Sequence, residues 1–150
     1  MDWLEGCDLA DRLAQATLSP GETISLALIV AEALGFAHTR GIVHRDLKPS
    51  NVFLVHGRIE QAVVLDFGLA RQSAMPRVTR TGVMMGTPGY MAPEQARGAS
   101  TVDARADVFS LGVMMFECLT GQLPFAAHQL PAILAKILFE NPPHVRERRA

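Results

Sequence analysis

The sequence predicts a mainly α-helical fold that contains one small antiparallel β-hairpin. Two kinds of observation predict the helices: apolar residues recur every three or four positions, and start and stop signals frame those stretches. The hairpin is predicted by two short β-prone runs, Val52–Val55 and Ala62–Leu65, on either side of a polar turn at residues 56–58.

The first half of the chain predicts two helices. Residues 8–16 form the shorter one, with two leucines four positions apart on one face. A capping box at residues 19–22, with proline at the first helical position, opens a longer helix that runs to about Arg40 and stops at Gly41. The predicted buried face of this helix consists of Ile24, Ala27, Leu28, Ala31 and Leu34.

The second half predicts a long segment without periodicity and then two more helices. Residues 71–89 are rich in Pro, Gly, Thr, Arg and Met, a composition typical of functional loops when it occurs inside a compact domain. A helix begins at Asp103 and stops at Gly121, and because it is apolar on more than one face it should be central and buried. A last helix spans about residues 128–140, with no helix expected after Pro142-Pro143.

The composition argues against several classes of protein. The chain has 150 residues, an apolar fraction of 49% and a formal net charge of −1, so charge gives no reason to expect nucleic acid or a membrane surface as a partner. Cys7 and Cys118 are too few for a disulfide framework or a zinc site. We find neither a run of about 18 apolar residues nor a signal peptide, and we expect a cytoplasmic location without a membrane segment.

Three ordered motifs carry the chemistry: HRDLKPSN at residues 44–51, DFG at 66–68 and APE at 92–94. Their polar residues are Asp46, Lys48, Asn51 and Asp66. Two carboxylates, an ammonium and an amide in this order suit one phosphoryl transfer, which needs positioning and charge neutralisation. Taken singly, the aspartate and asparagine of the first motif read as ordinary turn residues. The joint pattern favours the catalytic interpretation.

These motifs resemble the catalytic loop, the magnesium-binding turn and the end of the activation segment of Ser/Thr protein kinases, most closely those of bacteria. The resemblance implies that residues 1–150 are a partial protein kinase domain: the hinge and a C-terminal lobe, truncated, with the N-terminal lobe absent. The activation segment is expected at residues 66–94.

The resemblance also implies the roles of the polar residues. Asp46 would accept or orient the proton of the attacking hydroxyl, and Lys48 would neutralise charge on the transferred phosphoryl group. Asn51 and Asp66 would hold Mg²⁺, and ATP would be the phosphate donor. The nucleotide-binding residues implied by the resemblance are Asp2, Leu4, Asp8, Phe53 and Leu65. Simple core packing stays open as the alternative for Leu4.

In this family the arginine before the catalytic aspartate, here Arg45, meets a phosphate on the activation segment. Thr79 and Thr81 are the candidate acceptors, because a phosphate there would pair with Arg45. Solvated loop threonines are an equal alternative. Thr87 matches a position that favours Ser/Thr substrates, and Lys48 points to the same substrate class.

Several residues have structural roles in the resemblance. Asp107 should accept hydrogen bonds from backbone N–H groups near His44 and Arg45, because an unpaired buried carboxylate is costly; a plain helix-start aspartate is the alternative. His44 is expected to be a structural hydrogen-bonder. Further structural positions are Phe67, which would pack between the lobes, Gly68, which suits the tight turn, and Glu94, which is expected to be unpaired.

The glycine-rich loop and the lysine of a kinase N-terminal lobe do not occur in these 150 residues. Three hypotheses follow. The chain belongs to an active Ser/Thr kinase acting on protein substrates, with the missing N-terminal lobe as its partner; it is a non-catalytic remnant that acts as a binding module; or it is a fragment without function. The intact motif set favours the first, with weak or no activity for the isolated chain.

Overall fold

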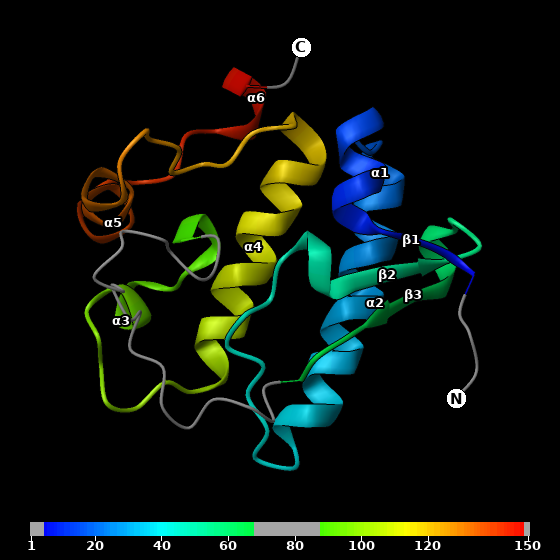
Figure 1. Cartoon of the computed structure of the whole chain (residues 1–150), viewed down its shortest axis with the longest axis horizontal. Helices are drawn as coiled ribbons and strands as arrows, with labels where there is room; N and C mark the ends of the chain where they lie inside the picture. The colour runs from blue at the N-terminus through cyan, green and yellow to red at the C-terminus, as the bar shows by residue number, and fades with distance from the viewer. Residues whose placement is uncertain (1–4, 68–87, 149–150) are drawn as a thin grey trace.

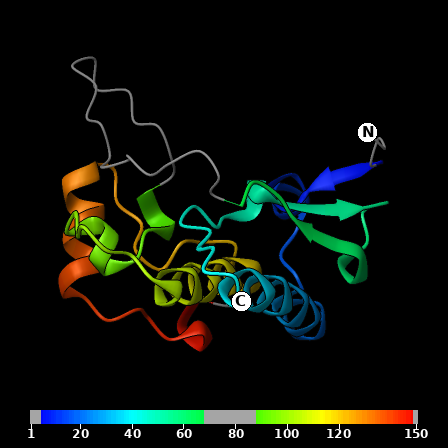
Figure 2. The ribbon, with the colours of Figure 1, turned by 90° about the horizontal axis from the view of Figure 1, so that it is seen from below.

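The computed structural model describes residues 5–67 and 88–148, and within them it is mainly helical with a small antiparallel sheet (Figure 1), as predicted. The elements in chain order are β1 (Gly6–Asp8), α1 (Leu9–Gln15), α2 (Pro20–His38), β2 (Val52–Val55), β3 (Ala62–Val64), α3 (Pro93–Ala96), α4 (Ala104–Thr120), α5 (Leu130–Phe139) and α6 (Val145–Arg148). Figure 2 shows the sheet over α2 at one end of the molecule and α3 with α5 at the other end.

The sheet has the strand order β1-β2-β3, with both pairs antiparallel. The predicted hairpin is confirmed, with Phe53 opposite Val63, whereas β1 was not predicted because three residues are too short to show a period. β1 pairs with β2 so that Cys7 faces Leu54. Gly6 has φ +154°, and a Cβ there would lie 2.0 Å from the Leu54 carbonyl oxygen, so this close approach requires glycine.

The capping box that opens α2 forms as predicted. The Ser19 N–H donates to Glu22 Oε2 at 2.8 Å, and the Glu22 N–H donates to Ser19 Oγ at 3.2 Å. The predicted buried face of α2 is mostly wrong: Leu34 is buried as predicted, but Ile24 and Leu28 are 57% and 66% exposed. The residues of α2 that are buried are Thr23, Leu26, Val30, Leu34 and Ala37. Because α2 is apolar on nearly every side, its sequence is compatible with more than one buried face. Packing against α4 and β3 decides which face is buried.

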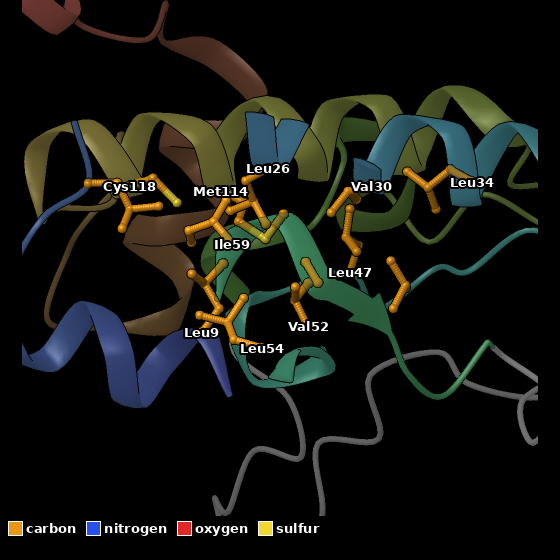
Figure 3. Packing of buried hydrophobic residues seen from close by; sticks show 13 residues of the cluster. Leu9, Leu26, Val30, Leu34, Leu47, Val52, Leu54, Ile59, Met114 and Cys118 are labelled. Atoms are coloured by element: carbon orange, nitrogen blue, oxygen red, sulfur yellow. The ribbon is translucent and has the colours of Figure 1, made fainter. Parts of the chain in front are cut away.

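The predicted central position of α4 is confirmed. Asp103 caps its start by accepting from the Arg105 N–H at 2.9 Å, and Gly121 ends it with φ +70°. Met114 and Cys118 belong to the larger core cluster, where α4 meets α1, α2 and the sheet (Figure 3), while Val113 belongs to a second cluster that includes residues of α5. The helix therefore joins the two cores.

The last two helices are short. α5 buries Ile137, and the prediction of no helix after the proline pair at 142–143 is wrong, because α6 follows it. One helical turn is too short to show a periodicity in the sequence.

One helix among the described residues, α2, is long and apolar enough to cross a membrane, with a mean hydropathy of 1.3 over its 18-residue window. Length and composition alone do not establish a membrane segment, because the core helix of a globular domain passes the same test. Leu26, Val30 and Leu34 of α2 lie in the larger core cluster.

Candidate active site

The HRDLKPSN stretch leaves α2 and ends in a 3₁₀ turn, Pro49–Asn51, that leads into β2. Lys48 Nζ lies 2.8 Å from Asp46 Oδ2. The side-chain nitrogen of Asn51 donates to the Asp46 carbonyl oxygen at 2.8 Å and lies 3.5 Å from Asp46 Oδ2. The Asp46 side chain is still 49% exposed. Two of the predicted polar residues, Lys48 and Asn51, thus converge on a third, Asp46, whose carboxylate is open to solvent.

The sheet brings the backbone next to Asp66 against Asn51. β3 ends at Val64, and the Leu65 N–H then donates to the Asn51 carbonyl oxygen at 2.8 Å. Asp66 follows at once with φ +54°, a left-handed conformation that aspartate adopts more readily than most residues. The two expected magnesium ligands are therefore joined through one backbone hydrogen bond between the ends of β2 and β3.

The donor chemistry of this pair fits Mg²⁺. The Asn51 amide nitrogen is engaged by Asp46, which leaves the amide oxygen as the atom that can bind a cation, and Asp66 supplies a carboxylate. Among residues 5–67 and 88–148, no group of three or more His, Cys, Asp or Glu is arranged as a metal site. Mg²⁺ commonly takes only one or two protein ligands and completes its shell with phosphate oxygens and water.

The buried carboxylate of Asp107 holds the start of the loop. Its oxygens accept from the His44 N–H and the Arg45 N–H, each at 2.8 Å, as the resemblance implied. His38 Nε2 lies 2.7 Å from Asp107 Oδ2, a contact that the sequence did not reveal because the two residues are 69 positions apart. Arg45 has φ +66°, so the hydrogen bonds to Asp107 hold a residue in the left-handed conformation directly before Asp46.

His44 links the loop to the turn that carries Asp66. It is 1% exposed, and its Nε2 lies 2.9 Å from the Leu65 carbonyl oxygen. Its ring also lies against Phe67, with the centroids 5.1 Å apart and the planes tilted by 58°. These contacts have the structural character expected of His44, and Phe67 packs against the larger core cluster.

The APE motif opens the short helix α3, and the residue after it makes a contact that sequence reasoning missed. Gln95 Oε1 accepts from the Ala92 N–H at 3.0 Å, and Gln95 Nε2 donates to the Arg45 carbonyl oxygen at 2.8 Å. The ion pairs among the described residues do not include Glu94. The expected residues Gly68, Thr79, Thr81 and Thr87 lie outside the described part of the chain.

The expected nucleotide residues fall partly outside the described chain, since Asp2 and Leu4 precede residue 5. Phe53 and Leu65 are half-buried, and the alternating burial of β2 places Phe53 on the sheet face away from the core. Asp8 Oδ1 accepts from the Asp11 N–H at 2.8 Å, so one of its oxygens caps α1.

A pocket of about 380 Å³ lies beside the catalytic loop. It is lined by Ala10, Leu13, Ala14, Lys48, Pro49, Ser50, Tyr90, Glu117 and Gly121. Tyr90 donates its hydroxyl proton to Glu117 Oε2 at 2.5 Å. Burial raises the pKa of Glu117, although the hydrogen bond from Tyr90 acts in the opposite direction. Burial, together with the hydrogen bond to Glu117, raises the pKa of Tyr90, so the phenol keeps its proton. No pattern in the sequence indicated this pair.

A family model described as "Protein kinase domain" matches residues 1–146. The chain belongs to this family. Serine/threonine-protein kinase pkn2 of Myxococcus xanthus is 46% identical over 83% of the chain and 15% of its own length, and Pkn1 of the same organism is 45% identical over 95% of the chain and 21% of its own length. PknB of Mycolicibacterium smegmatis is 38% identical over 100% of the chain and 24% of its own length.

A solved structure agrees with these relatives. The crystal structure of the Mycobacterium tuberculosis PknI kinase domain, in a mutant form, matches with a TM-score of 0.69 and 32% identity, over 99% of the chain and 49% of that domain. The prediction of a bacterial-type Ser/Thr protein kinase family member is confirmed, and the chain spans about half of a kinase domain.

Proposed function

We propose that this chain supplies the catalytic and magnesium-binding residues of an ATP-dependent protein kinase, which transfers the γ-phosphate of Mg-ATP to a Ser or Thr hydroxyl of a protein. The observation that carries the proposal is the convergence of Lys48 and Asn51 on Asp46, with Asp66 next to the residue that is hydrogen-bonded to Asn51. Phosphoryl transfer depends on such positioning more than on covalent chemistry.

Each residue has a role that follows from its charge and position. Asp46, half exposed and held by its neighbours, accepts or orients the proton of the incoming hydroxyl. Lys48, 2.8 Å from that carboxylate, is placed to offset negative charge on the phosphoryl group as it moves. Asn51 and Asp66 offer oxygen ligands to Mg²⁺, which, when bound, neutralises phosphate charge.

The nucleotide and substrate assignments rest on the family. ATP would contact the hinge at Asp2 and Leu4 and lie against Phe53 and Leu65, and Ser/Thr preference would follow from Lys48 and Thr87. Free thiols at Cys7 and Cys118 support a cytoplasmic protein, and a formal net charge of −1 gives no reason to expect nucleic acid as a partner.

For a polypeptide of these 150 residues alone we propose weak or no turnover. They contain no glycine-rich phosphate loop and no second catalytic lysine, since Lys48 and Lys136 are the only lysines. Without them the γ-phosphate is poorly fixed, and misplacement alone can cost on the order of 100-fold in rate.

Incorporation of radiolabelled phosphate into a generic Ser/Thr protein tests the proposal. The chain is assayed alone and joined to a kinase N-terminal lobe that carries the glycine-rich loop and its lysine, with and without Asp46→Asn. We expect Asp46-dependent turnover in the joined form and little in the chain alone. Asp11→Asn, at an exposed position of α1, is the matched control and should keep full turnover.

Each outcome decides between the hypotheses. Robust Asp46-dependent turnover by the chain alone would overturn the claim of weak activity. Absence of turnover in the joined form, with folding verified by circular dichroism, would count against the kinase proposal and for the non-catalytic binding module.

A further inference from the structure

Arg45, the residue before the proposed catalytic aspartate, has both of its backbone polar groups bound by side chains from distant elements. Its N–H donates to Asp107 Oδ1 at 2.8 Å, and its carbonyl oxygen accepts from Gln95 Nε2 at 2.8 Å. Its φ of +66° is unfavourable for a residue with a side chain, so this conformation depends on what surrounds it.

The Gln95 contact requires a side chain that both accepts and donates a hydrogen bond, as an amide does. Its oxygen accepts from the Ala92 N–H at 3.0 Å, and its nitrogen donates to the Arg45 carbonyl at 2.8 Å. Reversing the amide would set N–H against N–H and oxygen against oxygen, so the two contacts together fix its orientation.

A capping box accepts Glu or Gln equally well at this place in a helix. Glutamate would keep the bond from Ala92 but would turn a carboxylate oxygen toward the Arg45 carbonyl, where a donor is needed. The need for a donor at Arg45, rather than the cap of α3, therefore explains why the side chain is glutamine.

We propose that Gln95 is a positioning residue for phosphoryl transfer, which holds the Arg45–Asp46 peptide group from its carbonyl side while Asp107 holds Arg45 from its amide side. This inference rests on the proposed function. Gln95 thereby ties α3, at the end of the APE motif, to the peptide group from which the Asp46 side chain projects. Loss of the donor leaves the fold intact and lets that peptide group move.

The test uses Gln95→Glu, which keeps the cap but loses the donor, and Gln95→Leu, which loses both without adding charge. Gln61→Glu is the control, because Gln61 is exposed on the turn between β2 and β3. The Arg45 carbonyl and the Asp46 N–H share one planar peptide group. In NMR spectra of the 150-residue chain, the backbone amide signal of Asp46 should therefore shift in both Gln95 variants. It should stay in place in the Gln61→Glu control.

The second readout is turnover by the chain joined to a kinase N-terminal lobe. Both Gln95 variants should lower kcat about five- to tenfold, the change that matches one neutral hydrogen bond, with the KM for ATP within about twofold. An unmoved Asp46 signal, or an unchanged kcat beside an inactive Asp46→Asn, overturns the inference while the proposed function stands. If no form turns over, the proposed function fails and the role of Gln95 in phosphoryl transfer fails with it; the Asp46 signal then decides only whether Gln95 holds the Arg45–Asp46 peptide group.

Discussion

The two halves of the HRDLKPSN loop are held in opposite ways. His44 and Arg45 are bound by groups far away in the sequence, above all by Asp107, 62 and 63 positions on. From Asp46 to Asn51 the described side-chain hydrogen bonds stay within the loop, because Lys48 and Asn51 are two and five positions from Asp46. Leu47, between them, is buried in the larger core cluster. His44 is 1% exposed, whereas the Asp46 side chain is 49% exposed.

The polar groups of the first half stabilise the fold, and those of the second half form the proposed site. The first half is part of the core, so its conformation is determined by packing and by satisfied buried polar groups. The second half leaves the Asp46 carboxylate accessible, as a site that must admit substrate requires. Removing the Asp107 contacts of the first half should therefore alter folding, and changes to Asp46, Lys48 or Asn51 in the second half should mainly alter turnover.

The largest effect is expected from Asp107→Ala, which breaks the first half. Removing the carboxylate leaves the N–H groups of His44 and Arg45 without their acceptor inside the protein. Each N–H group left unsatisfied costs about 1–3 kcal/mol, so we expect the unfolding free energy to fall by roughly 2–6 kcal/mol. Urea denaturation followed by far-UV circular dichroism measures the loss. Asp103→Ala on the same helix is the control, and its exposed cap should matter far less. Equal losses of unfolding free energy in the two variants would show that the Asp107 carboxylate does not hold the start of the loop.

The next prediction concerns the second half. Asp46→Asn should lower turnover of the joined kinase at least about 100-fold, because proton transfer loses its acceptor. The unfolding free energy should change by less than about 1 kcal/mol, since the ion pair with Lys48 is near the surface. A loss of stability comparable to that of Asp107→Ala would contradict the separation of the two halves.

Local patterns in the sequence were sufficient for much of the fold and for the motif residues. The capping box at Ser19 and the glycine stop at Gly121 depend on neighbouring residues, and both form as predicted. The hairpin is equally local. The catalytic roles of Asp46 and Asp66 stay predictions that come from spacing and resemblance, and activity assays test them.

What the sequence did not reveal depends on contacts between distant residues. The buried face of α2 is set by α4 and β3, so Leu26 is covered while Leu28, two positions later, is 66% exposed. His38 and Gln95 carry no local mark of their partners, which lie 69 and 50 positions away. A periodicity or a short motif contains no information about such pairs.

The pocket beside Lys48 contains the hydrogen bond between Tyr90 and Glu117, which allows a test with a smaller expected effect. Tyr90→Phe removes the hydroxyl that donates to Glu117, so a half-buried carboxylate loses its donor. We expect a loss of roughly 1–2 kcal/mol of unfolding free energy, near the lower end for hydrogen bonds to charged groups. Thr101→Val removes an exposed hydroxyl and should change stability by less than about 0.5 kcal/mol. Indistinguishable denaturation curves for the two variants would rule out a stabilising role for the pair.

The smallest effect is a pH dependence that originates at Glu117. Burial raises the pKa of this carboxyl above its ordinary value of 4.5, so the folded state binds its proton more tightly than the unfolded state does. Its contribution to stability is therefore complete below pH 4.5 and is lost as the pH rises through the raised pKa.

Glu117→Gln keeps an oxygen for Tyr90 but cannot ionise, so its unfolding free energy should lack this decline, whereas Glu32→Gln at an exposed site of α2 should retain it. Denaturation curves across the acid range measure the difference. Because the hydrogen bond from Tyr90 lowers the Glu117 pKa, Tyr90→Phe should extend the decline to higher pH. A decline that stayed in place in Tyr90→Phe would mean that the phenol does not act on this carboxyl.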